Sequence, residues 1–143
     1  MSFRASSLTL AAVVVVSSFA SLLTGCSSAD GAISLEPAST SLTDKANDAL
    51  FTVKVDEARE GGYALEGLAV KVKIDDGDTI TSTCVPNDTN ANKHLDQGET
   101  LSCSEGATNV FDAKSVGKEG TVQLFAKIDD KEELVGDATW TPK

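Results

Sequence analysis

The stretch that decides the fold reads LAVKVKIDDGDTITSTCV over residues 68–85. Its first half has an apolar side chain at every second position, namely Leu68, Val70, Val72 and Ile74. This period of two is the pattern of a half-buried β-strand. The sequence DDGD at residues 75–78 predicts a hairpin turn, because Asp and Gly tolerate the positive φ that such turns require. A Thr-rich strand over residues 79–85 follows, so the stretch predicts an antiparallel hairpin.

Short segments of the same kind recur on both sides of this hairpin. They lie around Ile33 and Leu35 and at residues 50–55, 99–104, 121–128 and 134–140. Turns are expected at residues 57–63 and 129–131, and residues 106–120 could hold a helical turn. No segment has a sustained 3.6-residue period. Seven short strands separated by turns predict an all-β fold, an antiparallel immunoglobulin-like β-sandwich.

The N-terminus has the pattern of a secretory signal. Arg4 precedes an apolar run over residues 8–23, which ends in Leu23-Thr24-Gly25-Cys26. The run is short for a bilayer span and small residues follow it. The tetrapeptide resembles a bacterial lipobox, and this resemblance implies that Cys26 is acylated and becomes the first mature residue. The alternative is an ordinary signal peptide with a chance cysteine.

The lipobox resemblance divides the chain into three parts. Residues 1–25 are then a lipoprotein signal peptide, residues 26–31 a lipidated tether and residues 32–143 the β-sandwich domain. Arg4 is the one charged residue among residues 1–25, so the net charge of −10 becomes −11 after cleavage. Such an acidic chain lacks the basic clusters that a nucleic-acid partner requires, and its charge suits cation binding.

Two cysteines remain if Cys26 carries lipid, namely Cys84 and Cys103. An exported chain meets an oxidising compartment, so this pair is expected to form a disulfide rather than a metal site or a nucleophile. Closing a loop of this length should contribute about 3 kcal/mol in the chain-entropy description.

Between these cysteines lies an acidic loop with regularly spaced oxygen ligands. Its first, third, fifth, ninth and twelfth places are Asp88, Asn90, Asn92, Asp96 and Glu99. This spacing resembles EF-hand and dockerin calcium loops, and more closely the Asp/Asn loops of secreted bacterial β-sandwich modules. The resemblance implies a calcium site to which His94 adds its backbone carbonyl and Glu99 a bidentate carboxylate. It also implies that Leu95 packs the loop into its domain.

The sixth place of the loop departs from that pattern. Calcium loops normally have Gly there, because the chain turns with positive φ, whereas this sequence has Lys93. Weak affinity is therefore expected, on the order of 10⁻⁴–10⁻³ M, as in extracellular modules. The alternative is a solvated hairpin loop whose Asp and Asn side chains form Asx-turns. A disulfide that pins both ends of the loop should favour metal capture, because the free loop has less freedom to lose.

These features predict a lipid-anchored, non-enzymatic lipoprotein of the bacterial cell envelope that binds an envelope protein or an extracellular ligand. Ser27 after the acylated cysteine resembles an outer-membrane sorting signal, if the organism is Gram-negative. Two alternatives stay open: a structural accessory subunit of an envelope complex, and a small metal-dependent hydrolase. The hydrolase is less favoured, because the proposed ligands form a saturated shell without an open catalytic position.

Overall fold

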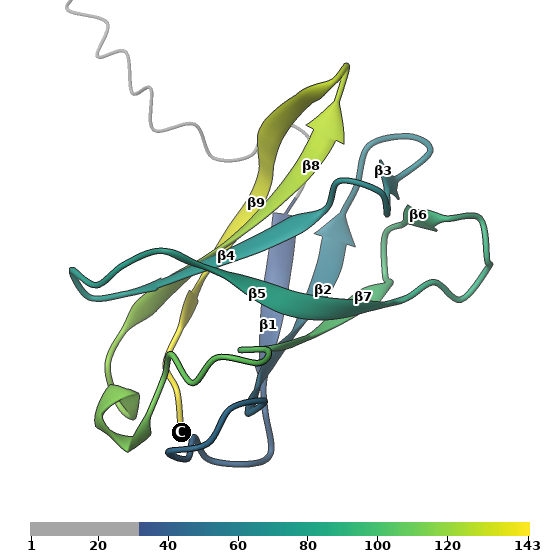
Figure 1. Ribbon diagram of the computed structural model, residues 1–143. Helices are drawn as coiled ribbons and strands as arrows, with labels where there is room; N and C mark the ends of the chain where they lie inside the picture. The colour runs from purple at the N-terminus through teal and green to yellow at the C-terminus, as the bar shows by residue number, and fades with distance from the viewer. Residues whose placement is uncertain (1–31) are drawn as a thin grey trace, which may run out of the picture.

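The computed structural model describes residues 32–143 of the chain (Figure 1). The expected signal peptide at residues 1–25, the acylated Cys26 and the tether at residues 26–31 lie outside these residues. Within the described part, no helix has the length and apolar character needed to cross a membrane.

The described residues form nine strands and a single 3₁₀ turn, η1 (Ala113–Ser115). The strands are β1 (Ala32–Pro37), β2 (Ala49–Glu57), β3 (Tyr63–Ala64), β4 (Ala69–Ile74), β5 (Ile80–Asn87), β6 (His94–Leu95), β7 (Thr100–Ser104), β8 (Gly120–Ile128) and β9 (Lys131–Trp140). Seven of them form one antiparallel sheet in the order β1-β2-β7-β5-β4-β8-β9, and β3 pairs with β6. The prediction of an antiparallel all-β fold is therefore confirmed.

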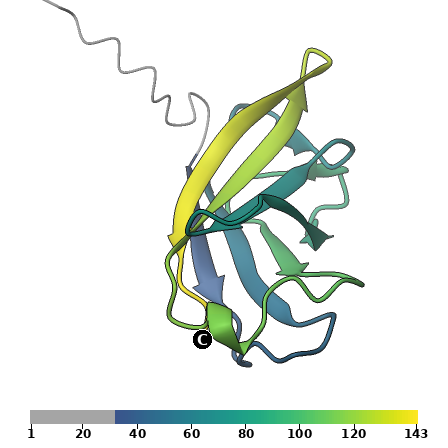
Figure 2. The same ribbon diagram turned by 60° about the vertical axis from the view of Figure 1, so that its left-hand side comes forward.

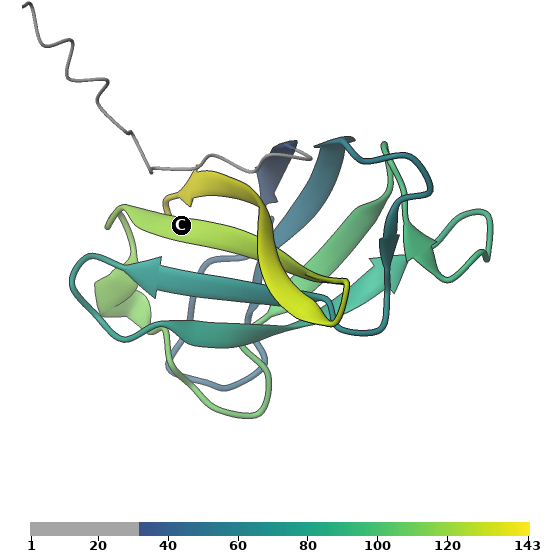
Figure 3. The same ribbon diagram turned by 90° about the horizontal axis from the view of Figure 1, so that it is seen from above.

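Strand β5 joins the two halves of the large sheet. Its residues 80–82 pair with β4, and its residues 83–87 pair with β7. The sheet curves, so that the β8–β9 hairpin lies in front of β1 and β2 in Figure 2. Seen from above, the two edge strands β1 and β9 approach each other (Figure 3). At this closure, Gly136 of β9 faces Ile33 of β1, and a Cβ atom on Gly136 would lie 2.8 Å from Ile33 Cγ2. The fold is nearly a barrel.

The core lies inside this curved sheet, and the alternation read from the sequence defines it. Alternate side chains along the strands are buried, namely Phe51, Val53 and Val55 of β2, Val70, Val72 and Ile74 of β4, Leu101 and Cys103 of β7, and Val122, Leu124 and Ala126 of β8. Leu68, the first apolar position of the 68–74 pattern, lies before β4 and is only partly buried, as is Ile128 at the end of β8. Trp140 meets Phe51 and Phe111 edge to face, with ring centroids 5.1 and 5.6 Å apart. Such geometry suits the charge distribution of aromatic rings.

The turns differ from the sequence expectation in detail. In the 75–78 turn the positive φ belongs to Asp75, at 47°, and not to Gly77. The last hairpin is tighter than expected, because β9 already begins at Lys131 and only Asp129 and Asp130 form the loop. Both have positive φ, 49° and 64°, as the two-residue turns that match the twist of a hairpin require.

The β3–β6 pair was not predicted. Residues 57–63 were expected to be only a turn, but Tyr63 pairs with Leu95 and Ala64 with His94. Tyr63 and Leu95 are both buried, with 2% and 0% of their surface exposed. The small sheet therefore attaches the acidic loop to the segment that follows β2.

Candidate metal-binding loop

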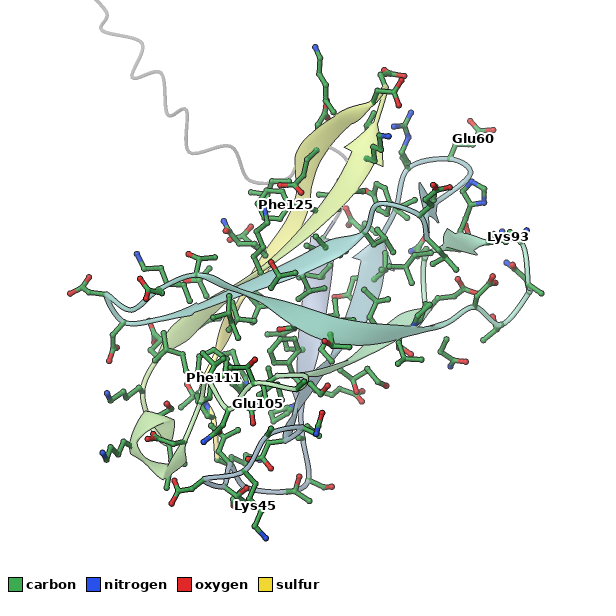
Figure 4. The ribbon with its side chains drawn as sticks, in the orientation of Figure 1. Lys45, Glu60, Lys93, Glu105, Phe111 and Phe125 are labelled. Atoms are coloured by element: carbon green, nitrogen blue, oxygen red, sulfur yellow. A yellow bond between two sulfur atoms is a disulfide. The ribbon has the colours of Figure 1, made fainter. Side chains whose placement is uncertain are left out.

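The acidic loop connects β5 to β7 and projects at one end of the molecule (Figure 1). Figure 4 places Lys93 on this loop and Glu60 on the neighbouring turn after β2. The last paired residues below the loop are Asn87 and Thr100. The loop is also held from the side, since Gly98 N donates to Val55 O at 2.7 Å. Both of its ends are thus fixed by the large sheet.

The predicted disulfide between Cys84 and Cys103 is confirmed. The two residues lie directly opposite each other on β5 and β7, with their Cα atoms 4.1 Å apart. Cys103 is buried, and Cys84 packs against the core. The disulfide therefore links the two strands that lead into and out of the acidic loop.

Three of the predicted ligands meet at one carboxylate oxygen. The side-chain amides of Asn90 and Asn92 donate to Asp96 Oδ2 at 2.8 and 2.7 Å. These hydrogen bonds lower the pKa of Asp96, that from Asn90 most, against a smaller opposing effect of burial. The side chains at the third, fifth and ninth places therefore lie together, but they meet through amide nitrogens, while Asn90 Oδ1 and Asn92 Oδ1 accept from the amides of Asn92 and His94.

Asp88, at the first place, binds the loop backbone. Its Oδ1 accepts from Asn92 N at 3.2 Å, and its Oδ2 accepts from Lys93 N at 2.8 Å. Lys93 has a φ of 64°, so the sixth place has the left-handed conformation that calcium loops normally give to Gly. A residue with a Cβ atom is strained there, by roughly 1–2 kcal/mol.

Glu99, at the twelfth place, closes the loop from the opposite side. Its Oε1 accepts from the amide and the hydroxyl of Thr89 at 2.7 and 2.8 Å, and its Oε2 accepts from Asp96 N at 2.9 Å. The Glu99 side chain is buried. The hydrogen bond from the Asp96 amide, followed by that from the Thr89 hydroxyl, lowers the pKa of Glu99. The carboxylate is therefore held ionised at neutral pH.

The β3–β6 pair orients the middle of the loop. Leu65 N donates to the Lys93 carbonyl at 3.0 Å, and Leu95 pairs with Tyr63. Residues of an antiparallel strand direct their backbone groups to alternate sides. The carbonyl of His94 consequently lies on the side away from β3, and its amide donates to Asn92 Oδ1 at 2.7 Å. Leu95 is fully buried, as the resemblance to calcium loops implied.

The donor set suits a hard cation, because every predicted ligand atom is oxygen. The carboxylates are, however, dispersed. Asp88 and Glu99 accept hydrogen bonds from backbone amides and do not join the Asn90–Asn92–Asp96 contact. Among residues 32–143, no three His, Cys, Asp or Glu side chains lie together as they would around a metal ion. Binding of calcium would therefore require Asp88 and Glu99 to exchange these hydrogen bonds for the ion.

Thr89 and Gly62 contribute to the loop and were not predicted. Thr89 donates two hydrogen bonds to Glu99. Its role could have been predicted from its position, because a Ser or Thr near the start of an Asx-rich loop often hydrogen-bonds within that loop. Gly62 belongs to a Gly pair that was interpreted only as a turn. It lies close to Asp96, and a Cβ atom built on it would also lie 2.9 Å from Leu95 O. Its contact with the loop depends on the unpredicted β3–β6 pair.

Elsewhere, an apolar recess of about 110 Å³ opens where β5 leaves β4. It is lined by Leu65, Leu68, Ala69, Val70, Thr81, Ser82, Cys84, Pro86 and Leu101. Its lining contains aliphatic side chains, two hydroxyls and a cysteine of the disulfide, and none of these groups ionises near neutral pH. The recess thus offers no acid–base pair.

Buried Glu105 resembles a site residue but organises a loop. Its Oε2 accepts from Val110 N and Phe111 N at 3.0 and 3.1 Å, and its Oε1 accepts from Asp48 N at 3.4 Å. These bonds hold the segment that brings Phe111 to Trp140. Three backbone donors account for the buried carboxylate, as such groups require.

Comparisons with protein-family models, with curated proteins and with solved structures find no match to this chain.

Proposed function

We propose that the chain is a lipid-anchored lipoprotein of the bacterial cell envelope whose non-enzymatic β domain binds a partner and carries a weak calcium site. Calcium serves to stiffen the loop at residues 88–99 and not to perform chemistry. The partner is an envelope protein or an extracellular ligand, and the membrane is reached through the lipid on Cys26.

One observation carries the calcium assignment: the side chains of Asn90, Asn92 and Asp96 meet at 2.7–2.8 Å within a loop whose other polar ligands are Asp88 and Glu99. The hydrogen bonds now made by Asp96 Oδ2 are those that a cation would replace. The positive φ of Lys93 supports the same assignment. Calcium prefers about seven hard oxygen ligands, and the side chains of this loop would supply them after exchanging their present hydrogen bonds for the ion.

The immunoglobulin-like sandwich belongs to this proposal. It is supported by the division of β5, since residues 80–82 belong to the β4–β8–β9 half and residues 83–87 to the β1–β2–β7 half. Strands that switch sheets form the corners of orthogonal two-sheet packings, so the division of β5 supports two layers, and their immunoglobulin-like arrangement is part of the proposal. The sandwich presents its connecting loops at two ends, and binding residues of β domains are commonly on such loops.

The non-enzymatic assignment is supported at two places, the acidic loop and the apolar recess. The predicted oxygen ligands of the acidic loop would surround a cation without leaving the open position that a catalytic metal needs. The apolar recess is lined by groups that do not titrate near neutral pH. Neither arrangement supports a hydrolase.

The test is a melting curve of the full chain in detergent, with calcium chloride against a chelator. A ligand that binds only the folded protein raises its stability by about 2.7 kcal/mol at a concentration of 100 Kd. For a domain of this size we expect an increase in Tm of roughly 5 °C or more at 10 mM calcium. An unchanged Tm at this concentration contradicts the calcium site. Fatty-acid modification of Cys26, measured by mass spectrometry, tests the anchor separately.

A further inference from the structure

Strand β5 has a free backbone edge beside the apolar recess. Its ladder with β4 ends at the pair Val70–Ser82. The next place on β4, opposite Cys84, would belong to Leu68, but Leu68 lies before β4 and its amide donates to Leu65 O at 3.4 Å. In Figure 1, β4 and β5 separate toward the acidic loop, where β5 continues alongside β7. From Cys84 onward, β5 therefore has a partner on one side only among the described strands.

The disulfide shows which backbone groups face this free edge. In an antiparallel pair, Cα atoms about 4.5 Å apart belong to opposite residues that exchange no backbone hydrogen bonds, whereas about 5.5 Å marks the hydrogen-bonded pairs. The Cα atoms of Cys84 and Cys103 lie 4.1 Å apart. The amide and the carbonyl of Cys84 therefore point away from β7, as does the carbonyl of Pro86 two residues later. An added strand would bind this donor and these two acceptors.

The apolar recess lies at the same edge and has room for one side chain. Its volume is about 110 Å³, whereas pockets for drug-sized ligands have about 300–1,000 Å³. Leu65, Leu68 and Leu101 supply aliphatic surface. Ser82 also lines the recess, and its buried hydroxyl has no hydrogen-bond partner among the described residues, which costs free energy. The recess therefore suits one aliphatic side chain that belongs to a larger, hydrogen-bonding molecule.

The free edge lacks the charges that normally protect such an edge. Natural proteins place charged residues on unpaired strands, which keeps other chains from adding to them. Residues 79–87 contain no charged residue, although charged residues make up 24% of the chain. Val85 in this stretch is 66% exposed, more than any other large apolar residue described. Pro86 protects the edge only in part, because it removes a single donor. The edge therefore permits a partner strand.

The charges beyond the edge select the partner. Strand β5 ends at Asn87, and the acidic loop follows with the half-buried carboxylates of Asp88 and Asp96. At about 3.4 Å per residue, Asp88 lies roughly 13 Å further along the chain than Cys84, the length of four extended residues. A peptide with a basic residue at that distance from its aliphatic residue complements the loop. The net charge of −10 disfavours a second copy of the same chain.

We propose that the recess and the free edge of β5 bind an extended peptide segment of another protein. The segment adds as a strand along Cys84 and Pro86, places one aliphatic side chain in the recess and carries a basic residue toward the acidic loop. This inference specifies the surface and the chemical class of the partner proposed above, and it rests on that partner-binding function. It does not require the loop to bind calcium.

The test titrates the full chain in detergent with the synthetic peptides KTVTVTK, ETVTVTE and KTDTDTK, in chelator and at low salt. Backbone amide shifts in NMR spectra give the affinity and the place of binding. KTVTVTK should shift the amides of residues 65–70 and 82–87 and slow the hydrogen exchange of the Cys84 amide. ETVTVTE should bind at least about tenfold more weakly, with a smaller difference at high salt. KTDTDTK should not bind, because burying a charge in the apolar recess is unfavourable.

Two variants with matched controls locate the site on the protein. Ala69→Leu fills the recess and Val85→Lys charges the free edge, so each should weaken the binding of KTVTVTK at least about tenfold. Ala49→Leu and Val110→Lys make the same changes at exposed positions outside the recess, and both should retain the affinity. Melting curves identify any variant that fails to fold, and Ala69→Val replaces Ala69→Leu in that case.

The contrary outcomes are distinct. If no peptide shifts residues 65–70 and 82–87 at millimolar concentration, the peptide site is overturned. If 2-methylpropan-1-ol shifts them and the peptides do not, the recess binds a small molecule instead. Equal weakening in the control variants overturns the location of the site.

Failure of the inference and failure of the proposed function are separable. A calcium-dependent increase in Tm and an acylated Cys26 without peptide binding would overturn this inference alone. Binding of KTVTVTK without a calcium response or without acylation would leave this surface in place and overturn the calcium site or the anchor.

Discussion

Glu99 closes the acidic loop by accepting two hydrogen bonds from Thr89, ten residues earlier, through a single carboxylate oxygen. The same carboxylate reaches Asp96 N through its other oxygen. One buried side chain therefore joins the beginning and the end of the loop before any ion binds. This arrangement makes the loop sensitive to changes at Glu99.

We predict that Glu99→Gln removes the calcium-dependent increase in Tm and also lowers Tm in chelator. Glutamine has the same shape but only one acceptor oxygen, so either the Thr89 donors or the Asp96 amide lose their partner. Melting curves with calcium and with chelator measure both effects. Glu36→Gln on the exposed end of β1 makes the same charge change and serves as the control. If the Glu99→Gln protein keeps its calcium-dependent increase in Tm, Glu99 is not a calcium ligand.

Cys84→Ser/Cys103→Ser should lower the free energy of unfolding by about 3 kcal/mol, because the unfolded chain regains the entropy of an open loop. We also expect weaker calcium binding in the folded variant, since the disulfide holds the two strands below the loop. Urea unfolding and calcium titration measure the two effects. If the well-folded double variant binds calcium with the affinity of the unmodified protein, the disulfide does not contribute to metal binding.

Acid should destabilise the metal-free protein through the loop. The pKa values of Asp96 and Glu99 are lowered in the folded state, so their contribution to stability is complete above the pKa of the unfolded chain. It is lost as the pH falls toward the lower folded-state pKa, and the loss begins at about pH 4. Urea unfolding in chelator between pH 3 and 7 tests this, at roughly half-unit steps. Asp96→Asn should give a shallower pH dependence than the unmodified protein, and an equal slope would contradict the assignment.

Lys93→Gly should raise calcium affinity roughly two- to fivefold, because it removes one screened positive charge from near the ion. It also relieves the strain of a φ of 64°, although glycine has more freedom in the unfolded chain. Ala91→Gly is the matched control, since Ala91 has a φ of 56° and no charge. Calcium titration of both variants at low and high salt separates charge from strain. A gain in Ala91→Gly as large as that in Lys93→Gly would assign the effect to strain.

Gly136→Ala tests the closure of the sheet. A methyl group there would lie 2.8 Å from Ile33 Cγ2, so we expect a loss of about 1–3 kcal/mol in the free energy of unfolding. The same substitution in an Ile33→Ala background should cost less, because the clashing atoms are absent. Urea unfolding of the four proteins in this cycle provides the measurement. Strict additivity would show that Gly136 and Ile33 are not coupled.

The strands could be predicted because alternation is a local property of the sequence. Val70, Val72 and Ile74 were assigned to one face by their spacing alone, and all three are buried. Irregularities were harder. Leu50 and Phe51 are both buried because the pairing of β2 with β7 shifts between Ala49 and Phe51, and a shift of register leaves no periodic signal.

The candidate site divides in the same way. The disulfide partners, which the structure confirms, and the calcium ligands, which stay a prediction, both follow from residue type and spacing. The hydrogen bonds of Asp88 and Glu99 to backbone amides do not, since they depend on how the loop closes. The β3–β6 pair was missed because a two-residue strand is too short to show a period, and its partner is distant in the sequence.

By itself, the sequence determined the antiparallel β class, the inward faces of β2, β4 and β8, the cysteine pair and the spacing of the Asp, Asn and Glu residues in the loop. Each depends on neighbouring residues or on the count of one residue type. Only the tertiary structure decided that β5 divides its pairing between two halves, that Ile33 meets Gly136 and that Gly62 lies against Asp96. Those contacts join segments far apart in the chain, and their geometry comes from the twist and closure of the whole sheet.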